Sequence, residues 1–163
     1  MSKGNFRKRR REFDSNKIDM LPADVFPEDA ILHEFEGRRI SNILLEFASP
    51  LVTKIDPENT FQFRLMLYFS ALAWNFSYFN EGEERTKALD RFVLNNDFFS
   101  EDKRGQVHTI VNSFAMRKRK MFWQYDFMLL NFEVIKGEKN STVIASAIPS
   151  YLMDNESFYG KVN

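Results

Sequence analysis

The sequence contains no cysteine among its 163 residues. Disulfide bonds, thiolate metal sites, iron–sulfur clusters and thiol catalysis are therefore excluded. Glycine and proline are also scarce, with 6 and 5 residues, whereas phenylalanine occurs 18 times. This composition excludes a disordered or loop-rich chain and favours helices packed around a phenylalanine-rich core. A chain of this length accommodates one ordinary domain.

Long hydrophobic runs are absent as well. No window offers about 18 uncharged apolar residues, because Arg64 interrupts the longest apolar stretch. The basic residues near the N-terminus lead into further charged residues rather than into the apolar region of a signal peptide. The sequence therefore predicts a cytoplasmic protein with no membrane partner.

The sequence contains only two histidines, and the common catalytic motifs are absent. His33 precedes a glutamate, but position 37 is Gly37, so the two-histidine zinc-protease motif is not present. The nucleophile elbow, the dinucleotide-binding glycine fingerprint and the Walker loop are absent too. We expect His108 to be a hydrogen-bonded residue at the core boundary rather than a general base, for which Asp102 and Asp126 would be the candidate carboxylate partners. The sequence thus disfavours an enzyme and predicts no catalytic residue, metal or cofactor.

The net charge of zero hides an uneven distribution of charge along the chain. The first eleven residues contain no acidic residue and six basic ones, namely Lys3, Arg7, Lys8, Arg9, Arg10 and Arg11. Such a run repels itself, so residues 1–12 are predicted to be a disordered basic arm. Residues 13–149 are predicted to form a single globular domain, in which residues 13–27 lie extended against the rest. Residues 150–163 are predicted to be a C-terminal tail.

One helix is predicted to be the central element of the fold. Asp56 as N-cap and Pro57 at the first helical position start a helix over about residues 57–79. Apolar residues cover most of its circumference, and only a strip around Arg64, Tyr68 and Asn75 is clearly polar. A helix of this kind must be covered on several sides, so the other helices are expected to surround it.

Further helices are predicted on both sides of the central one. The first begins near Pro27 and restarts after Gly37, and its apolar stripe comprises Ile40, Ile43, Leu44 and Phe47. Ser49-Pro50 is typical of the start of a short helix or of a kink. Two more helices are expected over about residues 83–93 and 100–121.

The hydrophobic period changes from helix to strand after Trp123. Alternation over about residues 126–136, turn residues at 137–140 and an apolar run over about 141–148 predict a β-hairpin. In the first strand we expect one apolar face, formed by Met128, Leu130, Phe132 and Val134. A lone hairpin is marginally stable, so it must pack on the helices or pair with another chain. The predicted fold class is α+β, mainly α-helical, with four to five helices around the central helix.

Two basic clusters are candidate nucleic-acid-binding sites. The first comprises Arg7, Lys8, Arg9, Arg10 and Arg11, and the second comprises Arg117, Lys118, Arg119 and Lys120 beside Phe122, Trp123 and Tyr125. Cations neutralise phosphates, and aromatic rings stack on bases. The alternative is a solvated tail for the first cluster and, for the second, a helix end whose cations oppose the helix dipole while its aromatic residues face the core.

The leading functional interpretation is a small non-enzymatic protein-interaction module that self-associates. It depends on the excess of aromatic residues, the unsupported hairpin and the tail, which keeps Tyr151, Leu152, Phe158 and Tyr159. Association with nucleic acid is the first alternative. The second is a small-ligand binder or enzyme with a pocket near Arg64 and Asn75, since ligand pockets combine apolar walls with a few polar groups.

Overall fold

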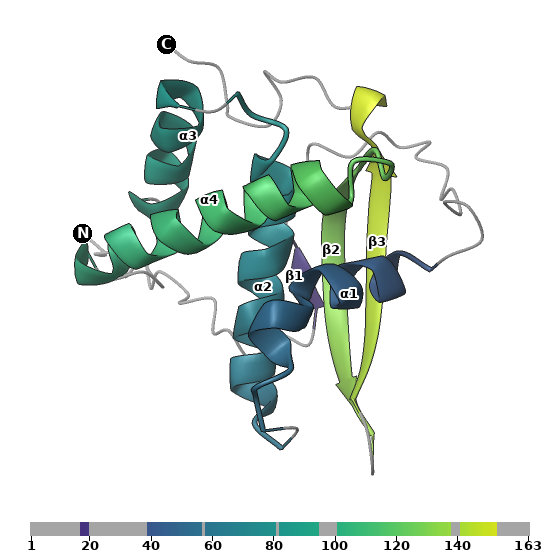
Figure 1. Ribbon diagram of the computed structural model, residues 1–163. Coiled ribbons are helices and arrows are strands. Elements are labelled where there is room, and N and C mark those ends of the chain that lie inside the picture. Colours follow the sequence, from purple (N-terminus) through teal and green to yellow (C-terminus); the bar gives the residue numbers. More distant parts are fainter. Residues whose placement is uncertain are drawn as a thin grey trace, which may run out of the picture.

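The fold is known from a computed structural model that describes residues 17–19, 39–56, 58–80, 82–94, 101–137 and 141–152 (Figure 1). Its elements are β1 (Lys17–Asp19), α1 (Ile40–Val52), α2 (Thr60–Phe76), α3 (Glu83–Leu94), η2 (Glu101–Lys103), α4 (Arg104–Met121), β2 (Phe127–Lys136), β3 (Ser141–Pro149) and η3 (Ser150–Leu152). Four α-helices are thus followed by an antiparallel hairpin. The predicted mainly helical α+β class is confirmed.

Helix α2 is the centre of the molecule. Every residue from Leu67 to Phe76 is buried. Helices α1 and α4 and strand β2 all pack against α2, and Figure 1 shows α4 crossing it while the sheet lies alongside. The predicted central helix, covered on several sides, is therefore confirmed.

The start of α2 differs from the prediction. Asn59 is the N-cap, and its Oδ1 accepts a hydrogen bond from the backbone N–H of Gln62 at 3.0 Å. Asp56 instead accepts from the N–H of Glu58 at 2.9 Å, which forms a turn before the helix. Asp and Asn are equally good caps, so local sequence does not decide between two positions three residues apart. The prediction of Asp56 as N-cap is wrong, and Pro57 lies outside the described residues.

Helix α1 continues through Pro50 to Val52, so Ser49-Pro50 does not start a new helix. The predicted apolar stripe is confirmed, because Ile43, Leu44 and Phe47 are buried. The helix predicted near Pro27 lies outside the described residues, as do residues 1–12.

Three antiparallel strands form the sheet, in the order β1-β2-β3. Strands β2 and β3 are the predicted hairpin, and α1 and α2 pack against it. The third strand was not predicted. It pairs Lys17–Asp19 with residues 131–133 of β2, so the N-terminal segment supports the hairpin from within the same chain.

The predicted apolar face of β2 is partly wrong. Phe127, Leu129, Phe132 and Val134 belong to the main core, whereas Met128 and Leu130 are buried outside it. The cause is a register shift between Leu129 and Asn131 in the pairing with β3. An irregularity of this kind inserts one residue and exchanges the two faces of the strand beyond it. Strict alternation in the sequence therefore assigns the first half of β2 to the wrong face.

Aromatic rings connect the elements of the core. Phe47 of α1 meets Trp74, Phe114 and Phe122 edge-to-face, with ring centroids 5.1–5.5 Å apart. Trp74 also stacks on Phe127 of β2 at 4.8 Å. Aromatic pairs of this geometry contribute about 0.5–1.5 kcal/mol each beyond the burial of their area. The phenylalanine-rich composition is thus used to join α1, α2, α4 and β2.

Candidate functional site

The basic run near the end of α4 is used largely inside the fold. Arg117 Nε donates to the Phe47 carbonyl at 3.2 Å, and its Nη2 donates to the Glu46 carbonyl at 3.4 Å. In a continuous helix the N–H of residue 50 would bind the Glu46 carbonyl, but Pro50 has no N–H. Arg117 supplies a donor at that position of α1. Its guanidinium also lies over the Phe122 ring.

Arg119 closes the C-terminal end of α2. Its Nε and Nη2 donate to the carbonyl of Ser77, the C-cap residue, at 3.1 and 3.0 Å, and Nη2 also donates to the Phe79 carbonyl. Buried Arg85 of α3 donates to the same Phe79 carbonyl at 2.9 Å. Cations stabilise these carbonyls because the helix dipole is negative at this end.

Lys118 is buried between two aromatic rings. Its Nζ donates to the Tyr125 carbonyl at 2.8 Å and lies 4.9 Å from the ring centres of both Trp74 and Tyr78. Burial lowers the pKa of Lys118 to about 8, although the charge of Asp126 acts in the opposite direction. Burial, together with the charge and hydrogen bond of Asp126, raises the pKa of Tyr78. The ammonium thus serves as an internal cation that joins α4 to α2.

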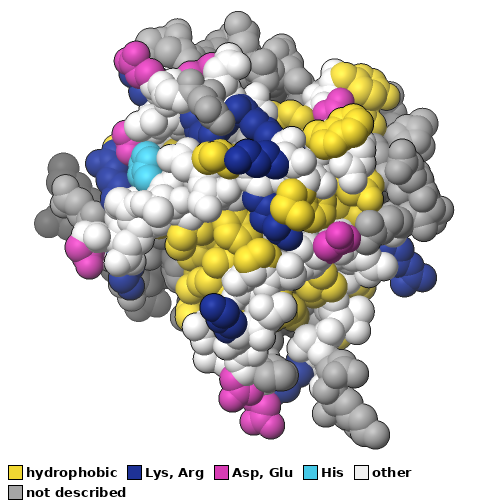
Figure 2. Space-filling view, viewed as in Figure 1, with side chains coloured by type: hydrophobic (Ala, Val, Ile, Leu, Met, Phe, Trp, Pro, Cys, Tyr) yellow, Lys and Arg dark blue, Asp and Glu magenta, His cyan; other side chains and the backbone are white. Residues whose placement is uncertain are grey.

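The second basic cluster is only partly exposed to solvent: Lys118 is buried, Arg117 is half-buried, and Arg119 and Lys120 are exposed. Arg117, Lys118 and Arg119 donate to backbone carbonyls, and Phe122 and Tyr125 are buried. Lys120 and Trp123 are exposed, and Figure 2 shows basic and hydrophobic side chains side by side over the end of α4. The first basic cluster lies outside the described residues. Nucleic-acid binding remains a prediction, and this cluster offers few outward-facing donors to support it.

Asn75 binds the edge of β2 as a strand would. Its Nδ2 donates to the Leu129 carbonyl, and its Oδ1 accepts from the Leu129 N–H, both at 2.8 Å. Within the described residues, the pairing of β1 with β2 extends as far as Asn131, and the Asn75 amide binds the β2 backbone two residues before that point. Trp74 and Tyr78 lie one residue before and three residues after Asn75. Trp74 Nε1 and Tyr78 Oη both donate to the Phe127 carbonyl.

Arg64 and Asn75, the two residues of the predicted ligand pocket, lie about three turns apart along α2. Both are buried, but eleven residues separate them along α2, which corresponds to about 16 Å of helix. The open surface hollow lined by Gly105, Gln106 and Thr109 contains neither residue. The predicted ligand pocket near Arg64 and Asn75 stays a prediction.

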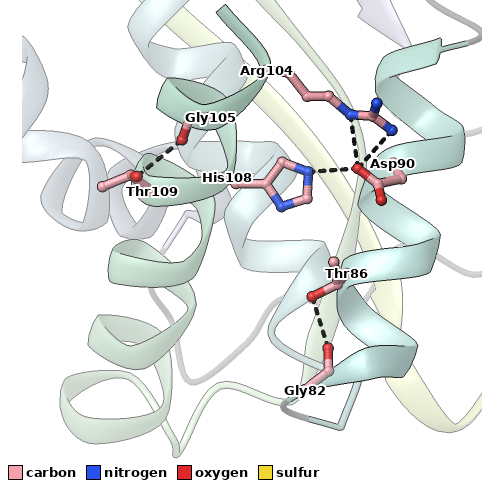
Figure 3. Close-up of polar contacts among 7 residues, drawn as sticks. All are labelled: Gly82, Thr86, Asp90, Arg104, Gly105, His108 and Thr109. Carbon is pink, nitrogen blue, oxygen red and sulfur yellow. Dashed lines mark hydrogen bonds and ion pairs between the residues drawn. The ribbon is translucent and has the colours of Figure 1, made fainter.

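A polar cluster that the sequence did not indicate joins α3 to α4 (Figure 3). Oδ1 of Asp90 lies 2.9 Å from Arg104 Nε, 2.8 Å from Arg104 Nη2 and 2.9 Å from His108 Nε2. All three side chains are partly exposed. His108 is thus a hydrogen-bonded boundary residue, as predicted, but its partner is Asp90 rather than Asp102 or Asp126. Arg104 and His108 share a helix face at i and i+4, which was the available signal.

Metal and membrane chemistry find no support in the described residues. They contain no group of three or more His, Asp or Glu side chains that could hold a metal ion. None of the helices described is long and apolar enough to cross a membrane. Comparison with known proteins gives no matching family model, no matching curated protein and no matching solved structure.

Proposed function

We propose that the protein is a non-enzymatic module that acts through protein contacts, and that it self-associates through the outer edge of β3. The observation that carries the proposal is the combination of position and composition in this strand. In the described part of the chain, β3 pairs only with β2, so its other edge has no strand beside it.

The composition of β3 sets it apart from a protected edge strand. Edge strands of monomeric proteins usually carry charged residues, an internal proline or a bulge that prevents pairing with another chain. Ser141–Pro149 contains no charged residue, and its proline is the last residue. The side chain of Ile144, near the middle of the strand, is 53% exposed. These features favour the addition of a further strand.

A second copy of the same chain is the occupant that fits this edge. Antiparallel pairing of β3 with β3 about a two-fold axis uses one patch twice and is closed, so it ends at a dimer. The uncharged strand brings no like charges together at that axis. The two sheets would then join into one continuous sheet.

Light scattering after size-exclusion chromatography tests this proposal with two matched variants. Ile144→Lys places a charge on the exposed face of the edge strand, close to the same residue of the second copy, where like charges oppose pairing. Ile135→Lys is the control, because Ile135 is 42% exposed but lies on the central strand β2. We expect a dimer for the unmodified chain and Ile135→Lys, and a monomer for Ile144→Lys. A monomeric unmodified chain would overturn the proposal.

A further inference from the structure

The sulfur of Met121 has a polar partner that the other exposed methionine of the same helix lacks. Met121 is the last residue of α4 and is 58% exposed, and its Sδ accepts a hydrogen bond from Arg117 Nη1 at 3.0 Å. Met116 is 46% exposed, but its sulfur accepts no hydrogen bond in the described part of the chain. One exposed thioether of α4 is thus held against a guanidinium, and the other is not.

This contact involves the same guanidinium that joins α4 to α1. Arg117 and Met121 lie at i and i+4 on one face of α4, where side chains meet. Two further hydrogen bonds of the arginine run to α1, from Nε to the Phe47 carbonyl at 3.2 Å and from Nη2 to the Glu46 carbonyl at 3.4 Å. Met121 therefore binds the third nitrogen of a group that already connects the two helices.

The thioether is the weakest acceptor of the three groups that Arg117 binds. A methionine sulfur accepts hydrogen bonds only weakly. Oxidation converts the thioether into a polar sulfoxide, whose oxygen carries partial negative charge. A hydrogen bond from an ionised donor is roughly twice as strong as one between neutral groups when the acceptor is a good one. Oxidation of Met121 therefore exchanges a weak acceptor for a strong one beside a permanent cation.

The position of Met121 allows this reaction without damage to the core. Its exposure gives a small oxidant access to the sulfur, whereas Met66 and Met128 are partly and fully buried. Oxidation of a core methionine disrupts packing, but Met121 lies outside the main core. Its unbranched side chain has three rotatable bonds, so the sulfur can move outward and make room for an added oxygen.

From these observations we propose that Met121 is a site of reversible oxidation by peroxide, at which the sulfoxide oxygen accepts the hydrogen bond from Arg117 and holds α4 more firmly to α1. The Met121 sulfur attacks one oxygen of hydrogen peroxide, an S–O bond forms and the O–O bond breaks. The proton of the transferred oxygen passes to the leaving hydroxide, so the sulfur is oxidised by two electrons and the peroxide is reduced to water. A methionine sulfoxide reductase, with thiols as the reductant, reverses the step.

Urea unfolding before and after mild treatment with hydrogen peroxide tests the proposal, with oxidation at each methionine followed by mass spectrometry of peptides. Met121→Leu is the control for oxidation at every other methionine. We expect Met121 to be oxidised at least as fast as Met116. The ratio of folded to unfolded chain should rise about three- to tenfold on oxidation, relative to the same treatment of Met121→Leu. Methionine sulfoxide reductase should return the ratio to its starting value.

Three further variants connect the gain in stability to the guanidinium. Arg117→Leu removes the donor and should abolish the gain, whereas Met116→Leu should keep it in full. Ile144→Lys should also keep it, so a failure of self-association at β3 and a failure of this proposal are separate results. An equal response of the unsubstituted chain and Met121→Leu, a loss of stability on oxidation of Met121, a gain that persists in Arg117→Leu, or slower oxidation of Met121 than of Met116 would each overturn the proposal.

Discussion

At the scale of single residues, Lys118 and Asn75 show how polar side chains on or near α2 are used within the core. The Asn75 amide hydrogen-bonds to the backbone of β2 as a neighbouring strand would, and the Lys118 ammonium lies between two aromatic rings. Both residues were predicted as sites for an external ligand. In the fold, each has a backbone partner on the segment from Tyr125 to Leu129, which explains their burial without a ligand.

Lys118 should make stability depend on pH in the alkaline range. Its pKa in the folded protein is about 8, below the ordinary value of 10.5. Between these values the unfolded chain binds more protons, so the free energy of unfolding rises with pH. Relative to Lys118→Met, the unmodified chain should gain about 1 kcal/mol between pH 7 and 9.5, after allowance for solvent screening. Urea unfolding at several pH values measures this difference, and parallel pH profiles would contradict it.

Tyr78 sets the upper pH limit for this comparison of unfolding free energies. Its pKa is raised above the ordinary value of 10, so the folded protein binds more protons than the unfolded chain at higher pH. Its contribution to stability therefore falls above about pH 10. Because Tyr78 is present in both proteins, the comparison below pH 9.5 isolates Lys118.

Replacement of Asn75 by leucine should be strongly destabilising. Asn75→Leu has a similar volume, but it leaves the buried N–H and carbonyl of Leu129 without the partners they now have. We expect a loss of about 2–4 kcal/mol in the free energy of unfolding, measured in urea. Asn42→Leu on the exposed side of α1 is the matched control and should change stability by less than about 0.5 kcal/mol. Equal effects of the two substitutions would refute the assigned role.

At the scale of secondary structure, the elements are joined by side chains that bind the backbone of a neighbour. Arg117 reaches α1, Lys118 reaches Tyr125 in the segment before β2, and Arg119 reaches the end of α2. The last turns of α4 are thus connected to α1, to α2 and to the segment that leads into β2. A basic run that resembles a binding site in the sequence is used to satisfy carbonyls that the other elements leave available.

A double-mutant cycle tests the link between Arg117 and Pro50. Arg117→Met should lower the free energy of unfolding by about 1–2 kcal/mol, because the Glu46 and Phe47 carbonyls lose a charged donor. In a Pro50→Ala background, residue 50 supplies an N–H to Glu46, so the same substitution should cost less. A coupling energy of at least about 0.5 kcal/mol is expected for residues that share a partner. Strict additivity would show that Arg117 acts independently of Pro50.

Asp90 should control the local stability of α3. In Asp90→Ala, Arg104 and His108 lose the carboxylate that joins α4 to α3. The groups are partly exposed, so the global loss should be about 1 kcal/mol or less. Amide hydrogen exchange over Glu83–Leu94 should rise more than exchange over Thr60–Phe76. Glu83→Ala removes the exposed ion pair with Lys87 and should leave exchange nearly unchanged, which distinguishes the Asp90 cluster from an ordinary surface pair.

At the scale of the whole molecule, the sheet has two different edges. The β1 side is formed by the N-terminal segment and continued by Asn75. On the β3 side, no strand follows within the described residues. This asymmetry is the basis for the proposed dimer. Formation of that dimer is in turn expected to affect the stability of the protein.

Dimerisation should make thermal stability depend on protein concentration. A complex that forms only between folded chains raises the melting temperature as concentration increases. We expect this rise, followed by calorimetry over a hundredfold range of concentration, for the unmodified chain and Ile135→Lys. Ile144→Lys should show no dependence. A concentration-dependent melting temperature in all three proteins would place the interface elsewhere.

The sequence by itself determined the fold class, the central helix and the positions of most elements. These features depend on hydrophobic period and on the burial that an almost wholly apolar helix requires, both of which are local. Among details within elements, the sequence failed where two local signals were equivalent, as for Asp56 and Asn59, and where the register shift in β2 reversed the alternation.

Only the tertiary structure decided what the polar residues bind. The partner of His108 is eighteen residues away on another helix, that of Asn75 is fifty-four residues away, and that of Arg117 is seventy. No periodicity encodes such pairings, because they depend on how helices cross and on which carbonyls a proline or a strand end leaves without a donor. For the same reason, the basic run at Arg117–Lys120 had two interpretations in the sequence, and the fold shows three of its four side chains donating to backbone carbonyls.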